Sequence, residues 1–253
     1  MWNNVKKRLG LSLFLVALHV PGAVAEGPIP DIERYFPDDI GMRWTYQGAI
    51  DDKVQKIATY TNVSTVKGTM KKDGVEVKVI TESNQANQGP AERYFSRNED
   101  SIVYHGGEPS TPFEDRLVPY LVMQFPLSVG ESFVQVEKKA VPYGQDLDGD
   151  GIEELAEVSA SVTAAGFETV SVPAGLFKNA LKLTGLMKIK LTLSKTNEQF
   201  ELIDKTANWF ARDIGMVKGI ETIEFPEVDN IPATATVIKE DLSVLPQSPD
   251  VRH

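Results

Sequence analysis

Residues 158–164 read VSASVTA, and this stretch decides the class of fold. Apolar residues occupy the even positions, and serine or threonine occupies the odd ones. This period of two is typical of a β-strand with one buried face, because successive side chains of a strand point to opposite faces. The alternation recurs at 75–79 and at 186–193 (LMKIKLTL), and 234–238 is rich in β-branched residues. No sustained 3.6-residue pattern of helical length follows residue 25, so the chain is expected to be mainly β.

Turn signals divide the chain into about ten to twelve short strands. The clearest signals are residues 72–74 (KDG), 106–107 (GG) and 173–175 (PAG). Glycine and proline favour the backbone angles of tight turns. Many short strands separated in this way predict a curved antiparallel sheet, in the form of a half-barrel or a sandwich.

One pattern occurs twice, at residues 36–44 and 125–133, with the form Phe-Pro-x-x-aliphatic-Gly-x-x-aromatic. The glycine permits a tight turn, and the last aromatic residue opens the next strand toward the core. Two copies are too few for a stacked repeat. They are therefore expected to be equivalent strand entries within a single β-rich domain of residues 26–242. An alternative is a sheet of two halves with a junction near residue 115.

The two ends of the chain differ in composition from the β-rich part between them. Residues 6–8 are basic, an apolar run extends from Leu9 to Val20, and residues 23–25 (AVA) form a small-x-small cleavage site. This layout predicts a signal peptide over residues 1–25. A membrane anchor would need about 20 apolar residues, more than this run offers. Residues 243–253 contain two prolines and little apolar content, so they are expected to form a flexible tail.

Composition narrows the classes of partner. Removal of the signal peptide leaves 23 Lys and Arg against 36 Asp and Glu, a net charge of −13. Such a charge argues against nucleic acid and anionic lipid surfaces and favours cations. Cysteine is absent and only three histidines occur, which excludes disulfides, thiol nucleophiles, a lipid-anchoring cysteine and the common zinc sites. The mature chain is expected to be secreted, periplasmic or extracellular, without a transmembrane span.

The most specific motif is residues 146–157 (DLDGDGIEELAE), which match the calcium-loop pattern D-x-[DN]-x-[DN]-G-x₅-E. The predicted Ca²⁺ ligands are the carboxylates of Asp146, Asp148 and Asp150, the carbonyl of Ile152, a direct or water-mediated contact of Glu154, and a bidentate Glu157. The flanks alternate as strands do and include Pro142 and Gly144. The loop is therefore expected to close a β-hairpin around a structural Ca²⁺ ion, and not to join the two helices of an EF-hand. The alternative is a solvated acidic hairpin tip.

Catalytic motifs are scarce. Residues 105–107 (HGG) are similar to the oxyanion loop of some esterases, but no G-x-S-x-G elbow occurs, and the other histidine after residue 25 is His253. His105 is expected to be a strand-end residue beside a turn. Paired carboxylates of the glycosidase type stay open, because spacing in sequence does not give spacing in space. The scarcity of catalytic motifs favours a protein that is not an enzyme.

Three further segments carry a resemblance: residues 35–46 (YFPDDIGMRWTY), 168–177 (ETVSVPAGLF) and 208–218 (NWFARDIGMVK). Together they resemble a broad group of largely uncharacterised, secreted or lipid-anchored bacterial envelope proteins. The resemblance implies a curved antiparallel sheet similar to the LolA-like half-barrel of lipoprotein carriers. This chain departs from the group in lacking the lipobox cysteine and in carrying the acidic loop. The aromatic residues Trp44, Tyr46, Phe177, Trp209 and Phe210 are expected to fill the concave side of such a sheet.

These patterns predict a secreted, non-catalytic, calcium-stabilised β-rich protein of the bacterial envelope or exterior, which acts by binding or as a structural component beside other surface proteins. One alternative is a periplasmic carrier of a lipid or hydrophobic ligand, which requires a sizeable apolar cavity with aromatic residues at its rim. Another is a hydrolase, which requires convergent carboxylates with raised pKa values in a cleft. An assembly subunit would instead have a filled core and an unpaired strand.

Overall fold

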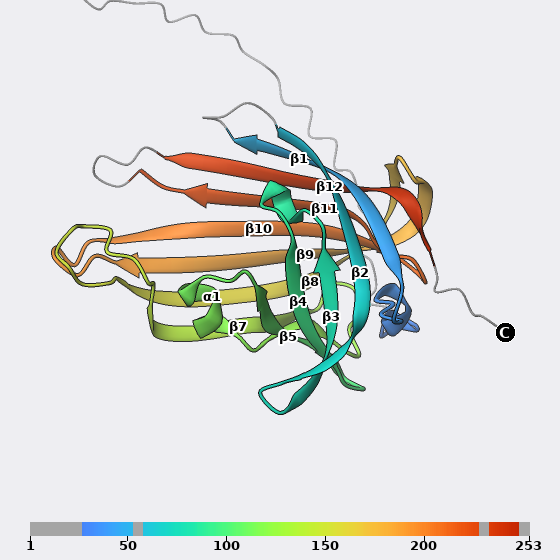
Figure 1. Cartoon of the computed structure of the whole chain (residues 1–253), viewed down its shortest axis with the longest axis horizontal. Helices are drawn as coiled ribbons and strands as arrows, with labels where there is room; N and C mark the ends of the chain where they lie inside the picture. The colour runs from blue at the N-terminus through green and yellow to red at the C-terminus, as the bar shows by residue number, and fades with distance from the viewer. Residues whose placement is uncertain (1–26, 53–57, 228–232, 248–253) are drawn as a thin grey trace, which may run out of the picture.

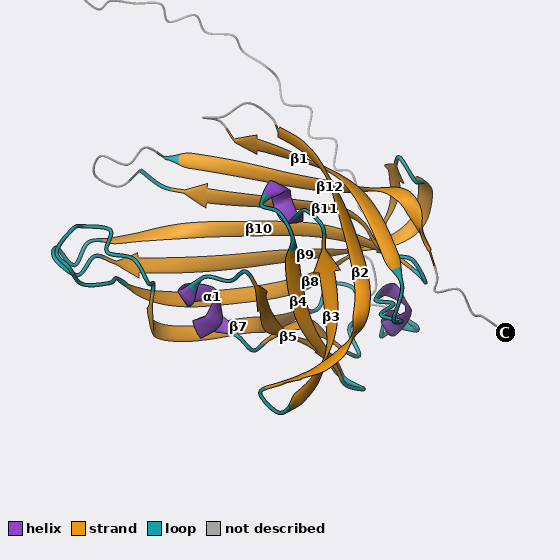
Figure 2. Ribbon diagram, in the orientation of Figure 1, coloured by secondary structure: helices purple, strands orange, loops and turns teal. Residues whose placement is uncertain are grey.

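The structure is a computed structural model of the chain, and it describes residues 27–52, 58–227 and 233–247. The predicted signal peptide and the last residues of the predicted tail, 248–253, lie outside the described residues. The described part is mainly β, as predicted (Figures 1 and 2). Its helices are η1 (Ile32–Tyr35), η2 (Gln85–Asn87) and α1 (Pro112–Leu117). Within the described ranges, no helix is long and apolar enough to cross a membrane.

Twelve strands form one antiparallel sheet in the order β6-β5-β4-β3-β2-β1-β12-β11-β10-β9-β8-β7. The strands are β1 (Arg43–Asp52), β2 (Ala58–Lys72), β3 (Val75–Glu82), β4 (Ala91–Arg97), β5 (Ser101–Glu108), β6 (Tyr120–Gln124), β7 (Ser132–Pro142), β8 (Leu155–Val172), β9 (Gly175–Thr192), β10 (Gln199–Ala211), β11 (Gly215–Phe225) and β12 (Thr234–Gln247). The first and last strands pair with each other, and the two edge strands, β6 and β7, lie in contact. The sheet therefore curves until it nearly closes on itself.

The sheet has two halves of six strands, β1–β6 and β7–β12. In Figure 1, β2–β5 run across the direction of β7–β12, so the halves face each other. Each copy of the Phe-Pro pattern leads into the first strand of a half: Trp44 is the second residue of β1, and Phe133 is the second residue of β7. Gly41 and Gly130 have φ angles of 93° and 87°, which glycine adopts without strain. The two copies thus precede β1 and β7, the halves meet between β6 and β7, and residue 115 lies within α1.

The segments predicted as strands lie in β3, β8, β9 and β12, and the turns at 72–74 and 173–175 close the hairpins β2–β3 and β8–β9. The predicted start of the tail differs from the structure, because β12 continues to Gln247. Residues 243–247 are held in the sheet by pairing with β1, and Ser243 Oγ donates a hydrogen bond of 2.9 Å to the carbonyl of Thr45.

The turn predicted at residues 106–107 is wrong, since both glycines lie inside β5. The pairing of β4 with β5 shifts register between Arg93 and Phe95, and Gly106 has a φ of 98°. A Cβ on Gly107 would lie 2.5 Å from Nη1 of Arg93. The two glycines form a local irregularity of β5 that leaves room for the Arg93 side chain. His105 therefore lies within a strand and not beside a turn. Oγ of Ser96 lies 2.8 Å from Nε2 of His105.

The expected placement of Trp209 on the concave side is also wrong. Phe210 lines the interior of the sheet and pairs with the fully buried Leu181 of β9, whereas Trp209 pairs with the partly exposed Lys182. Directly opposed residues of paired strands share a face, so the two side chains point to opposite faces. Trp209 lies on the outer face beneath the β8–β9 hairpin, where its Nε1 donates a hydrogen bond of 2.8 Å to Glu168. The ammonium groups of Lys182 and Lys218 lie 4.9 and 5.6 Å from its ring centre. Phe177 packs in the same cluster of buried apolar side chains as Trp209.

The helix α1 is an element that strand periodicity could not predict. Its start is a capping box: the N–H of Glu114 donates to Thr111 Oγ1 at 3.2 Å, and the N–H of Thr111 donates to Glu114 Oε2 at 2.8 Å. These bonds satisfy backbone donors that a helix start leaves free. Leu117 of α1 packs on buried residues of β7–β9. The apolar clusters fill much of the interior, but cavities remain where the halves face each other.

Candidate functional site

An apolar cavity of about 300 Å³ lies between the two halves of the sheet. Its volume is at the lower end of the range of small-molecule sites, ~300–1,000 Å³. Residues of β1–β6, β10 and β11 line it, so it exists only because the sheet curves over itself. The aromatic residues of the lining are Tyr35, Phe36, Trp44, Tyr46, Phe95 and Phe210. This is the kind of cavity that the carrier hypothesis requires.

The two aromatic residues of β1 are held in place by carbonyls of the β11 region. Trp44 Nε1 donates a hydrogen bond of 2.5 Å to Ile214 O, and Tyr46 Oη donates one of 3.1 Å to Met216 O. Gly215, with a φ of 90°, lies between these carbonyls, and a Cβ there would be 3.2 Å from Trp44 Nε1. Burial raises the pKa of Tyr46, so its hydroxyl stays a donor. These bonds give the cavity a preformed wall.

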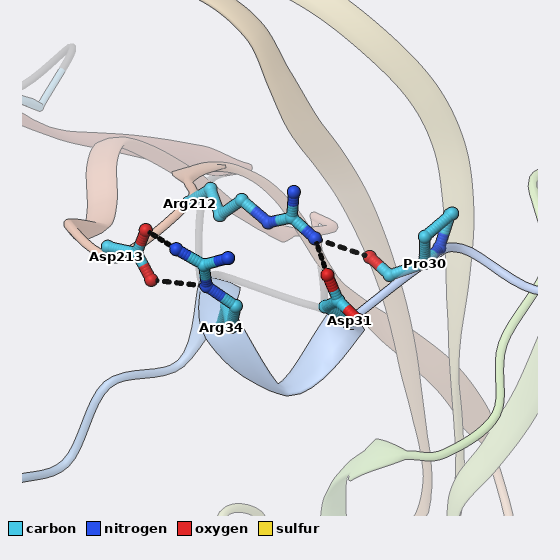
Figure 3. A network of polar contacts seen from close by, with 5 residues as sticks. All are labelled: Pro30, Asp31, Arg34, Arg212 and Asp213. Atoms are coloured by element: carbon cyan, nitrogen blue, oxygen red, sulfur yellow. Dashed lines mark hydrogen bonds and ion pairs between the residues drawn. The ribbon is translucent and has the colours of Figure 1, made fainter.

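Residues 28–41, here called the N-terminal strap, cover one end of the cavity with Tyr35 and Phe36. Two ion pairs tie the strap to the β10–β11 turn, Arg34 with Asp213 and Arg212 with Asp31 (Figure 3). All four side chains are about half exposed. The guanidinium of Arg34 lowers the pKa of Asp213. Exposed pairs of this kind contribute only ~0–1 kcal/mol each, so the strap is weakly anchored on its outer side.

The strap also brings charge to the cavity. Asp38 lies 3.1 Å from Lys78 Nζ and 3.2 Å from Arg97 Nη1. Arg97 donates further hydrogen bonds to the carbonyls of Phe36 at 2.6 Å and Glu33 at 3.0 Å. Lys78 and Arg97 lie on β3 and β4, so the strap closes onto the first half of the sheet through these cations.

A second cavity of about 230 Å³ lies nearby, and carboxylates converge on it. Glu240 Oε1 accepts hydrogen bonds from Tyr60 Oη at 3.1 Å and from Asn62 Nδ2 at 3.3 Å. On neighbouring strands, burial together with the charge of Asp204 raises the pKa of Glu221 to about 7. Burial likewise raises the pKa values of Asp204 and Glu240.

The convergence of these carboxylates was missed by the sequence analysis. A signal for it does exist, because Glu240 follows Ile238 at the spacing of two that places both side chains on one face of β12. Acidic residues at inward positions of a predicted strand are unusual, since burial of a carboxylate costs free energy. Which acidic residues of other strands meet Glu240 depends on the order and register of the strands, and these are properties of the assembled sheet.

The acidic loop joins β7 to β8 at the end of these strands opposite η1 (Figure 1). It brings one carboxylate oxygen each of Asp146, Asp148 and Glu154 within 4.8 Å of one another. Glu154 is fully buried, and its two oxygens accept hydrogen bonds from the N–H groups of Leu147 at 3.0 Å and Ser194 at 2.9 Å. These three residues could hold a metal ion.

Asp146 organises the turn of this loop. Its carboxylate accepts hydrogen bonds from the backbone N–H groups of Gly149, Asp150 and Gly151, at 2.7, 3.2 and 2.8 Å. These bonds lower the pKa of Asp146. Gly151 has a φ of 90°, which explains why glycine follows the third aspartate.

Asp150 and Glu157 do not belong to this group of three carboxylates. Asp150 accepts hydrogen bonds from Ser194 Oγ at 2.8 Å and from the N–H of Ile152 at 2.9 Å. Glu157 lies in β8 opposite Lys190 with its side chain exposed. The structure therefore gathers the first two aspartates and Glu154 of the predicted ligand set.

The chemistry of this group fits a hard cation. Asp148 Oδ1 is buried and has no hydrogen-bond partner, and none of the Lys and Arg residues in the described ranges forms a salt bridge with Asp146, Asp148 or Glu154. Burying carboxylates without a compensating charge is costly. Each carboxylate oxygen has two lone pairs, so the oxygens that accept N–H bonds can also face an ion.

Comparisons with known proteins give two similar solved structures. A Bacteroides fragilis protein, described as an exported protein with a YMCC-like fold, is 15% identical, with a TM-score of 0.37 over 84% of this chain and 98% of its own. A protein from Parabacteroides distasonis, described as a lipoprotein, is 13% identical, with a TM-score of 0.36 over 83% of this chain and 97% of its own. No family model matches the chain, and no curated protein matches it.

Proposed function

We propose that this chain is an exported, non-catalytic binding protein that takes a small, mainly apolar ligand into the cavity between the two halves of its sheet. The observation that carries the proposal is the aromatic lining of that cavity, with Trp44 and Tyr46 held in place by hydrogen bonds to backbone carbonyls. A preformed apolar cavity with a few oriented polar groups is the usual form of a small-molecule site. The expected signal peptide supports export.

The proposal includes a structural Ca²⁺ ion in the acidic loop, held by Asp146, Asp148 and Glu154. Oxygen ligands of this kind suit Ca²⁺. Glu154 and Asp148 also bind backbone N–H groups of Ser194 and Lys195, which belong to the β9–β10 turn. An ion here would therefore tie the β7–β8 loop to that turn and stabilise the far end of the long strands, without taking part in ligand binding.

Native mass spectrometry of the protein, purified from an exported fraction without chelator, tests both parts. A co-purifying apolar mass that is released by organic solvent would support the cavity's role. An adduct of the mass of calcium that EDTA removes would support the acidic loop's role. A bare chain, together with no measurable binding of decanol or decanoate by titration calorimetry, would contradict the binding function.

A second candidate, hydrolysis, is favoured by the carboxylate cluster in the neighbouring cavity. Glu221, with a pKa of about 7, could act as a general acid, because such a group is protonated near neutral pH. Chromogenic glycosides and esters test this candidate. The hydrolase candidate would be supported if Glu221→Gln abolished turnover and Glu224→Gln preserved it. Glu224 serves as the matched control because it lies on the same strand and pairs with Lys205. Equal turnover by both variants would reject it.

A further inference from the structure

The charged side chains that line the apolar cavity carry one more positive charge than negative charges. The cavity is lined by three cations, Lys78, Arg93 and Arg97, and by two carboxylates, Asp38 and Glu82. Arg93 has its own partner, with its Nε 3.8 Å from Glu82 Oε2. Asp38 alone then faces both Lys78 and Arg97. One positive charge is left over, at a place where apolar side chains keep the local dielectric low.

Both cations are largely withdrawn from water. The side chains of Lys78 and Arg97 are 28% and 24% exposed, and each reaches Asp38 with a terminal nitrogen. The position of Asp38 shows that a carboxylate fits between them, with one oxygen 3.1 Å from Lys78 Nζ and the other 3.2 Å from Arg97 Nη1. A second carboxylate at this place would complete the charge balance and gain charge-assisted hydrogen bonds.

From this arrangement we infer that the ligand of the cavity is a single-chain amphiphile with a carboxylate head group. Its alkyl part would contact Trp44, Phe95 and Phe210, and its carboxylate would bind Lys78 and Arg97, beside Asp38 or in its place. The inference rests on the proposed binding function and adds the chemical class of the ligand. Where the ligand takes the place of the Asp38 carboxylate, its own carboxylate replaces the contacts that Lys78 and Arg97 lose with charge-assisted hydrogen bonds of the same kind.

Titration calorimetry with decanoate and decanol on the wild-type protein at pH 7.5 tests the inference without any variant. The two probes have the same alkyl chain and differ in charge. Decanoate is expected to bind about tenfold more tightly than decanol, the ratio that corresponds to ~1.4 kcal/mol. This preference should decrease as salt is added, because screening weakens charge pairs.

Three variants locate the effect. Asp38→Asn removes the competing carboxylate and is expected to raise the affinity for decanoate several-fold while leaving that for decanol unchanged. Lys78→Gln is expected to remove most of the preference. Lys205→Gln is the matched control, because Lys205 pairs with Glu224 at 2.8 Å and does not line the cavity; it should keep the wild-type ratio.

The outcomes separate the inference from the proposed function. Equal affinities of the wild-type protein for decanoate and decanol would overturn the inference and leave the binding function standing. A preference for decanoate that stays at the wild-type value in both Lys78→Gln and Asp38→Asn would also overturn it, since the charge would then be recognised elsewhere. Failure of both probes to bind would contradict the binding function and the inference with it.

Discussion

The hydroxyl of Tyr60 donates a hydrogen bond of 3.1 Å to Glu240 across the backbone of Gly48. The three residues lie side by side on β2, β12 and β1, because Gly48 pairs with Tyr60 on one side and with Glu240 on the other. A Cβ at position 48 would lie 2.1 Å from the Tyr60 ring. Gly48 is therefore required so that a tyrosine can lie flat across one strand and reach a buried carboxylate on the next.

Gly48→Ala is expected to lower the free energy of unfolding by about 1–3 kcal/mol, the usual cost of overpacking, because the Tyr60 ring has to move away from Glu240. Tyr60→Phe keeps the ring and removes only the hydrogen bond, so its expected cost is smaller, ~1 kcal/mol. Urea unfolding of the two variants measures the difference. A Gly48→Ala protein as stable as the wild type would show that the ring does not lie across the strand.

Buried carboxylates should make the protein more stable in mild acid than at neutral pH. The pKa of Glu221 is raised to about 7, so between pH 5 and pH 7 the folded state binds more protons than the unfolded state. Stability then falls as pH rises through the folded-state pKa. The expected loss between pH 5 and pH 8 is about 1–3 kcal/mol, since one pKa unit corresponds to ~1.4 kcal/mol.

Glu221→Gln should flatten this dependence, because the amide does not titrate. Glu224→Gln is the matched control, since Glu224 forms an exposed pair with Lys205 on the same strand. Urea unfolding at a series of pH values checks the prediction. A stability of the wild type that rises from pH 5 to pH 8, or a Glu221→Gln profile identical to that of the wild type, would contradict it.

Calcium should raise the thermal midpoint of the wild-type protein relative to EDTA. The gain is ~2.7 kcal/mol at an ion concentration 100 times the Kd. Asp148→Asn should abolish the difference, because it removes the charge of a residue in the gathered group. Glu157→Gln should retain it, because Glu157 lies exposed on β8. If Glu157→Gln abolished the calcium effect and Asp148→Asn did not, the ion would be held by another ligand set.

Trp209 is predicted to be a stabilising residue of the outer face. Its truncation in Trp209→Ala should cost about 3–5 kcal/mol, because the indole is 7% exposed beneath the β8–β9 hairpin. Trp209→Phe keeps part of the packing and leaves Glu168 without the indole donor, so it should cost less. Thermal unfolding checks both. A loss under about 1 kcal/mol for Trp209→Ala would mean that the hairpin does not cover it.

The sequence predicted much of the fold because its signals are local. Alternation at residues 158–164 identifies a strand with one buried face, and the repeated Phe-Pro pattern identifies the entries to β1 and β7. Local signals also produced two errors. The glycine pair at 106–107 has the composition of a turn but lies in β5, and Trp209, which pairs with Lys182, does not share the inner face with Phe210, which pairs with Leu181.

The candidate sites also differ in whether local sequence signals could find them. The acidic loop was found as a motif, since its carboxylates are neighbours in sequence, but the motif does not place Glu157, which the pairing of β8 with β9 holds apart from the loop. The cavity and the carboxylate cluster were not assigned to residues, because their members come from both ends of the chain.

What the sequence determined by itself is therefore the strand content, the strand entries and the acidic loop, all set by spacings of a few residues. Tertiary structure decided which faces meet. The pairing of β1 with β12 brings Tyr60 to Glu240, and the curvature of the sheet brings Arg97 and Lys78 to the strap at Asp38. Such contacts depend on the register of strands far apart in the chain, and register is selected by the packing of the whole sheet.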